Sequence, residues 1–129
     1  VLRRIGRNQN LKTTSPAMPI AHCFVSPTAL NSAVHGSDPT QIWAQLADEE
    51  ADEMTITLIK REQQYGKPYH VMAELFLPSL WKPEKATALK IGLANALATH
   101  FGMPNKEILV ITHTVDSGQV IEDGDVVEW

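Results

Sequence analysis

The chain has 129 residues, of which 43% are apolar, 20% are charged and 6% are aromatic, and its formal net charge is −4. This composition is typical of one soluble globular domain and excludes a mostly disordered chain. The single cysteine, Cys23, excludes a disulfide scaffold, and since no apolar run approaches about 18 residues we expect no membrane span.

The charge is unevenly distributed. Residues 1–18 carry four basic residues and no acidic one, whereas residues 19–129 carry the other seven basic residues and all fifteen acidic ones. A protein that binds nucleic acid needs a basic face for the phosphate backbone. The acidic body therefore predicts no nucleic-acid partner, although it leaves room for a small anionic substrate.

Residues 1–18 are polar and lack clear periodicity, so we expect a disordered or non-native leader ahead of a domain at 19–129. Four interpretations of this segment stay open. The translation start is mis-assigned and the true start is Met18, or the segment is a disordered extension, a transit peptide or residues left from an expression vector. The segment has no apolar h-region, which disfavours a secretory signal. We expect a cytoplasmic protein.

The first half of the domain predicts one strand, one helix and a second strand. The apolar run at 19–27 is bounded by prolines and predicts a strand, and the Ser- and Asn-rich segment 28–40 predicts a loop. An Asp-Pro pair begins a short helix over 39–52. Alternating apolar residues then predict a strand over 54–62.

The second half repeats this order after a turn at 63–68. Alternation predicts a strand over 68–80, and apolar residues at spacings of three and four predict a helix over 83–101 that ends at Gly102. The apolar run 107–115 predicts another strand, and a short terminal hairpin follows it.

The order of elements predicts an α+β fold of duplicated β-α-β units. We expect a two-layer sandwich with helices on one face of a four-stranded mixed sheet. The other face of such a sheet needs cover, which a dimer or a trimer would supply.

Common catalytic motifs do not occur. There is no Gly-rich phosphate loop and no nucleophile elbow, and Cys23 has no local thiol partner. The histidines lack metal-ligand spacing, so we expect no metal and no cofactor, while a metal site assembled from them in three dimensions stays as a minor hypothesis. His100 lies where it would compensate a helix dipole. The five histidines are His22, His35, His70, His100 and His113.

The tripeptide Met18-Pro19-Ile20 opens the first predicted strand. If translation begins at Met18 and this methionine is removed, Pro19 becomes a secondary amine at the N-terminus. Burial or nearby cations lower the pKa of such an amine, which would make it a base near neutral pH. The alternative is a structural proline at the start of an edge strand.

A strand that begins Met-Pro-Ile, two β-α-β units and the passage FGMPNKEILVITHTV (101–115) together resemble the tautomerase superfamily. This superfamily includes 4-oxalocrotonate tautomerase, 5-carboxymethyl-2-hydroxymuconate isomerase and macrophage migration inhibitory factor. The resemblance covers about residues 18–118. It implies that Pro19 is the general base of a tautomerase or isomerase that moves a proton in a small carboxylated enol or α-keto acid. It also implies a homotrimer with pockets between subunits.

The resemblance further implies that cations hold the substrate carboxylate. Arg61, with its planar fork, and the adjacent Lys60 are the candidates, and each has the alternative of a solvated charge at a strand end. His113 is placed where it would donate to a developing oxyanion, or it is a satisfied strand histidine. Tyr69 and Trp81 would line the pocket or belong to the core.

The chain departs from the family in three ways, the first of which is a long loop at 28–38. Its first predicted helix is acidic, with a run of carboxylates over 48–53 in place of an arginine or lysine. Pro19 is also inside a peptide bond in the printed sequence, and an acylated proline nitrogen is not a base. Activity is therefore expected only from a chain that begins at Pro19. The alternative is a non-catalytic, tautomerase-like oligomeric binding protein.

Overall fold

A computed structural model describes residues 3–4 and 18–129 of the chain. Its main sheet has four strands in the order β3-β2-β4-β5. These strands are β2 (Ile20–Val25), β3 (Thr55–Lys60), β4 (Val71–Pro78) and β5 (Ile108–Val115). All four were predicted from alternation or apolar runs, and each observed strand is shorter than its predicted range.

Two parallel pairs make up this sheet. β2 lies parallel to β3, β4 lies parallel to β5, and the pairs meet through the antiparallel contact of β2 with β4. Each parallel pair is joined by a crossover that contains helix, as parallel strands require. The predicted fold of two β-α-β units in a mixed four-stranded sheet is confirmed.

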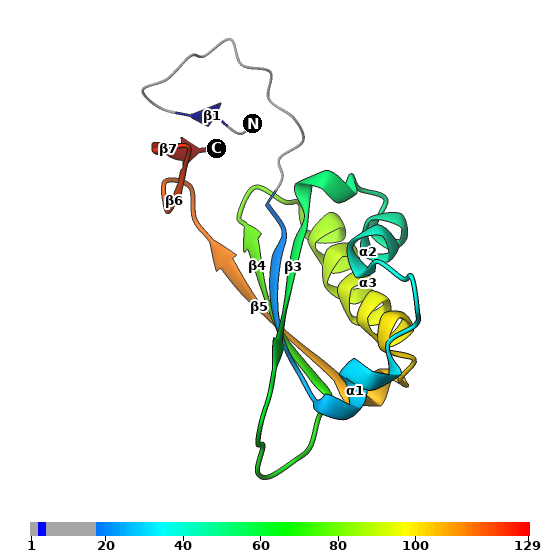
Figure 1. Ribbon diagram of the computed structural model, residues 1–129. Coiled ribbons are helices and arrows are strands. Elements are labelled where there is room, and N and C mark those ends of the chain that lie inside the picture. The colour runs from blue at the N-terminus through cyan, green and yellow to red at the C-terminus, as the bar shows by residue number, and fades with distance from the viewer. Residues whose placement is uncertain (1–2, 5–17) are drawn as a thin grey trace.

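The two longer helices cover one face of the sheet, and no described helix covers the other, which we call the open face (Figure 1). These helices are α2 (Pro39–Ala47) and α3 (Pro83–Phe101). They are joined by the indole Nε1 of Trp43, which donates to the carbonyl oxygen of Leu89 at 2.9 Å. Both residues are fully buried, so this hydrogen bond lies in the core between helices and sheet.

Helix α3 has the predicted bounds. Pro83 occupies its first turn, where a missing N–H costs nothing. Gly102 ends it with φ of 61°, a left-handed conformation that glycine adopts without strain. The helix buries Leu89, Leu93 and Leu97, which are among the periodic residues that predicted it.

The predicted loop at 28–40 is wrong in part, because a short helix, α1 (Pro27–Ser32), begins there. Ser26 caps it by accepting from the backbone N–H of Ala29 at 3.0 Å, and Pro27 follows in the first turn. The predicted helix over 39–52 ends at Ala47. The chain then turns through the left-handed Asp48 into a 3-10 turn, η1 (Ala51–Glu53).

A second 3-10 turn, η2 (Asn105–Glu107), precedes β5. The predicted terminal hairpin is confirmed as β6 (Val120–Glu122) and β7 (Asp125–Glu128). It stands apart from the main sheet beyond the end of β5 (Figure 1). A two-residue strand, β1 (Arg3–Arg4), pairs antiparallel with β7, while the remainder of the predicted leader, before Met18, lies outside the described residues.

Among the described residues, no helix is both long enough and apolar enough to cross a membrane.

Candidate functional site

Pro19 lies immediately before β2, which is a central strand of the main sheet. Its side chain is fully buried, and its carbonyl oxygen accepts from the backbone N–H of Thr55 at 3.1 Å. That hydrogen bond continues the β2–β3 ladder, whose first register pair is Ile20 with Thr55. Pro19 is thus held by a neighbouring strand at one end of the sheet.

Met18 holds an unusual backbone conformation for a residue with a side chain. Its φ is 81°, in the region that favours glycine. A positive φ costs a non-glycine residue about 1–2 kcal/mol. The backbone N–H of Met18 donates to the carbonyl oxygen of Glu53 at 3.3 Å, which holds the strained residue against the segment before β3. The peptide bond ahead of Pro19 therefore lies at a strained position.

A pocket of about 280 Å³ opens beside Pro19, between the start of β2 and strand β6 of the terminal hairpin. It is walled by the residues on either side of Pro19, by the entry to β3 and by β6: Met18, Ile20, Asp52, Glu53, Thr55, Val120, Ile121 and Glu122. Three of these carry carboxyl groups and none is a cation. Carboxylates near an amine raise its pKa, because they favour the charged form.

The sheet brings His113 to the same end as Pro19. Ile20 is paired with Phe76, and Phe76 is paired with His113 on the next strand. The imidazole of His113 stacks on the Phe76 ring, with centroids 4.9 Å apart and planes at 15°. Its Nε2 lies 3.4 Å from Oε2 of Glu74. His113 is half-exposed and already has a carboxylate partner.

Lys60 and Arg61 lie at the opposite end of the sheet. Lys60 pairs with Val25, the last residue of β2, and the backbone N–H of Arg61 donates to the Val25 carbonyl at 2.8 Å. A six-residue strand at about 3.3 Å per residue separates them from Pro19 by roughly 20 Å. The structure therefore does not bring the predicted base and the predicted cations together within one chain.

The guanidinium of Arg61 is partly engaged in its own subunit. Its Nη1 donates to the Tyr69 carbonyl oxygen at 2.5 Å, and its buried Nε has no hydrogen-bond partner among the residues that the structure describes. This contact ties the end of β3 to the segment that leads into β4. Tyr69 therefore belongs to the Arg61 end of the sheet and not to the pocket beside Pro19.

The described histidines and the cysteine do not form a metal site. No group of three or more His, Cys, Asp or Glu side chains in the described part of the chain could hold a metal ion. Cys23 is buried on the helix side of β2, and burial raises the pKa of its thiol to about 12. His100 is also buried, and its Nδ1 lies 2.9 Å from the Ser37 hydroxyl.

Burial lowers the pKa of His100, with a smaller opposing effect from Asp38. The neutral imidazole is therefore favoured, which weakens the helix-dipole role that its position in the last turn of α3 predicts.

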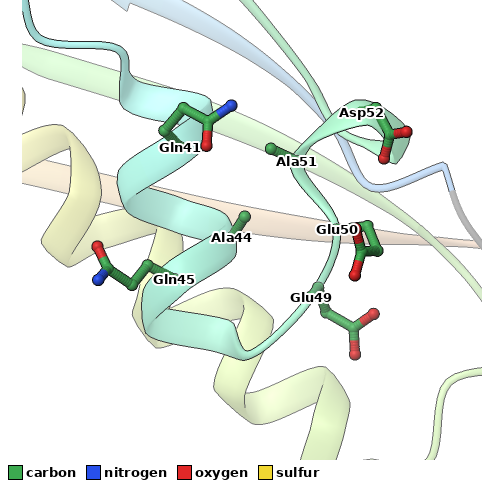
Figure 2. Close-up of a pocket in the computed structure, with 7 residues that line it drawn as sticks. All are labelled: Gln41, Ala44, Gln45, Glu49, Glu50, Ala51 and Asp52. Atoms are coloured by element: carbon green, nitrogen blue, oxygen red, sulfur yellow. The ribbon is translucent and has the colours of Figure 1, made fainter.

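A larger pocket, of about 560 Å³, lies between α2 and the η1 segment (Figure 2). Its lining residues are Gln41, Ala44 and Gln45 of α2, together with Glu49, Glu50, Ala51 and Asp52. The carboxylate of Glu49 is occupied by Lys85 at 2.9 Å. Carboxylates dominate this pocket, which makes it unsuitable for an anionic substrate.

The acidic lining of the pocket beside Pro19 was not predicted. The sequence shows the carboxylate run over 48–53 but predicts that it lies in a helix. The structure places Asp52 and Glu53 in the η1 segment beside Met18. The signal lay in the sequence, but its position depended on where α2 ends.

The fold matches known structures, although the sequence does not match known families. No protein-family model matches the chain, and no curated protein matches it in sequence. A native fused 4-OT structure superposes with a TM-score of 0.65 at 12% identity, covering 84% of this chain and 95% of that one. A fused 4-OT wild-type symmetric trimer gives a TM-score of 0.63 at 13% identity, with 84% and 94% covered.

Two other solved structures share the fold. N1, a member of the cis-3-chloroacrylic acid dehalogenase family, gives a TM-score of 0.58 at 12% identity, with 84% of this chain and 82% of that chain covered. The macrophage migration inhibitory factor from Trichinella spiralis gives 0.57 at 12% identity, with 84% and 98% covered. These likenesses establish the architecture alone: the chain shares the β-α-β fold of these solved structures, which is the fold that its sequence predicts.

Proposed function

We propose that this chain is a tautomerase or isomerase that moves a proton in a small carboxylated enol or α-keto acid. The base is the secondary amine of Pro19, freed when Met18 and everything before it are removed. The observation that carries the proposal is a buried proline at the start of a central strand, beside a pocket, in a fold shared with fused 4-OT. The strained backbone at Met18 supports processing at this point.

In the proposed reaction, the lone pair of the Pro19 nitrogen accepts a proton from the enol hydroxyl. The same nitrogen then returns a proton to the substrate carbon, so that an enol becomes a ketone with no net change in atoms or electrons. His113, at the same end of the sheet, donates a hydrogen bond to the oxygen that carries negative charge. The reaction needs no cofactor.

The substrate carboxylate needs a cation, and none of the described residues that line the pocket beside Pro19 carries one. We propose that a homotrimer supplies it, with Lys60 and Arg61 of one copy reaching the Pro19 pocket of the next. Charge complementarity supports this arrangement, because Asp52 and Glu53 line the receiving pocket and both cations lie at the opposite end of the donor. The trimeric state of a matched fused 4-OT structure also supports it.

The test compares the chain that begins at Val1 with a chain that begins at Pro19. Ketonisation of phenylpyruvate enol is followed by absorbance. Since a positioned general base contributes about 10²–10⁴-fold, we expect at least about 100-fold higher kcat/KM from the chain with the free amine. A chain that begins at Pro19 and carries Arg61→Ala should show a raised KM.

Two variants control this test. Pro104→Ala changes an exposed proline outside the site and should leave kcat/KM unchanged. Lys67→Ala removes an exposed cation from the same segment as Arg61 and controls for a general loss of charge. If neither starting form of the chain is active, the proposal is refuted.

The alternative is a non-catalytic oligomeric binding protein with the same fold. It is favoured by the acidic pocket beside Pro19 and by the roughly 20 Å that separates Pro19 from Arg61. Stabilisation of both starting forms by phenylpyruvate in a thermal shift assay, without turnover, would support this alternative. A cytoplasmic location stays a prediction, which fractionation of cells that express the native gene would test.

A further inference from the structure

The open face of the main sheet carries apolar side chains with a small titratable group at its centre. Alternation places Ala21, Cys23 and Val25 under the helices, so the intervening residues of β2 point to the open face. Phe24 of this face is 39% exposed, and Ile111 is 48% exposed. This face is the surface that the proposed trimer would cover.

Two histidines and one glutamate share the face. His22 lies directly opposite Glu74 in the register of β2 with β4, and its ring packs against Phe76 with centroids 5.1 Å apart. Phe76 stacks in turn on His113, whose Nε2 lies 3.4 Å from Oε2 of Glu74. Glu74 therefore neutralises a charge on His113, whereas no ion pair involving His22 is found among the described residues.

No other titratable side chain faces this group from the neighbouring strands. The register places Thr55, Thr57 and Ile59 of β3 on the open face, and Leu109 and Ile111 of β5. One copy thus contributes two imidazoles and one carboxylate. When both imidazoles are protonated, the open face carries one uncompensated positive charge.

We propose that His22 makes the assembly of this chain sensitive to acid: the copies associate through their open sheet faces while His22 is neutral and separate when it is protonated. This inference rests on the proposed homotrimer and adds its regulation. Association would remove His22 from water, and desolvation disfavours a charged imidazole. Assembly is therefore complete when histidine is neutral and weakens as the pH falls through its range of titration.

The expected effect follows from proton linkage. Imidazole in water titrates at about pH 6.5, and each one that must lose its proton lowers the association constant by up to about tenfold per pH unit below that value. Three copies contribute three such groups. The overall constant for trimer formation therefore falls by up to about a thousandfold per pH unit.

Sedimentation velocity from about pH 8 to about pH 5, at one ionic strength and one protein concentration, tests the inference. We expect a trimer at the alkaline end that dissociates toward the acid end. His22→Asn should remain assembled at the acid end. Glu74→Gln should dissociate at a higher pH than the native chain, because His113 then lacks its carboxylate. His35→Asn, an exposed histidine outside the face, should behave as the native chain does.

The fold itself has an acid-sensitive group, His100, so far-UV circular dichroism accompanies each measurement. Dissociation with loss of helix signal, equal in the native chain and in His22→Asn, would overturn the inference and assign the acid sensitivity to unfolding. A trimer that persists at every pH would also overturn it, while leaving the proposed assembly intact. A monomer at about pH 8 would instead refute the assembly, and the inference with it.

Discussion

The contact of α2 with α3 leaves room for one methyl group at Gly92, and we expect Gly92→Ala to stabilise the protein. An added Cβ would lie 3.4 Å from Cδ1 of Trp43, 3.6 Å from Cβ of Ala47 and 3.7 Å from its N. These are ordinary van der Waals separations. Glycine inside a helix costs about 1 kcal/mol relative to alanine, so the gain in helix propensity exceeds any small adjustment by Trp43.

A gain of about 1 kcal/mol raises the Tm of a domain of this size by about 4 °C. Gly102→Ala, at the end of the same helix, is the matched control with the opposite sign. Its φ of 61° strains any residue with a Cβ, although the nearest atom, the Ser32 carbonyl oxygen, is 3.6 Å away. The backbone cost of about 1–2 kcal/mol predicts a lower Tm.

Differential scanning calorimetry of the native chain and both variants, at one protomer concentration, measures the two shifts. A fixed concentration matters because the Tm of an oligomer depends on it. A lower Tm for Gly92→Ala would show that α2 and α3 pack too closely for a methyl group, and would refute the reasoning. A Tm unchanged by Gly102→Ala would refute the left-handed end of α3.

Three further predictions concern buried polar groups. Cys23, whose thiol pKa burial raises to about 12, should resist Ellman's reagent in the native protein and react rapidly in urea; fast native labelling would contradict its burial. Burial lowers the pKa of His100 in the fold, so its contribution to the free energy of unfolding should be present above about pH 6.5 and be lost as the pH falls. In urea titrations, the free energy of unfolding of His100→Gln should therefore change less with pH than that of the native chain. Ser26→Ala removes the cap of α1 and the 2.7 Å contact with Nδ1 of His70, and should lower the free energy of unfolding by about 1–2 kcal/mol, whereas Ser117→Ala in an exposed turn should change it less.

The sequence predicted α3 well because every local signal agreed. Pro83 marks its first turn, leucines recur at helical spacing, and Gly102 ends it. The segment before α2 carried a comparable start signal, Ser26-Pro27, but its polar composition favoured a loop. A cap and a proline were therefore better evidence for α1 than composition was.

The position of the candidate site depended on information that the sequence pattern did not contain. Pro19 was predicted at the start of a strand, and it lies there. The distance from Pro19 to Arg61 follows from the parallel pairing of β2 with β3, because the start of β2 and the end of β3 then lie at opposite ends of the sheet. Local periodicity predicts strands but not their partners, so Arg61 was grouped with Pro19 by resemblance alone.

The pairing of strands also gives the sheet an approximate internal twofold axis between β2 and β4. Pro19 immediately precedes β2 in the first unit, and His70 immediately precedes β4 in the second. These two positions lie at opposite ends of the sheet, and His70 is beside Ser26 and near Arg61. A circularly permuted chain cut before His70 would thus carry its terminal amine at the end of the sheet that already holds Lys60 and Arg61. The symmetry of the fold offers two places for a terminal amine, and the order of the chain determines which one is used.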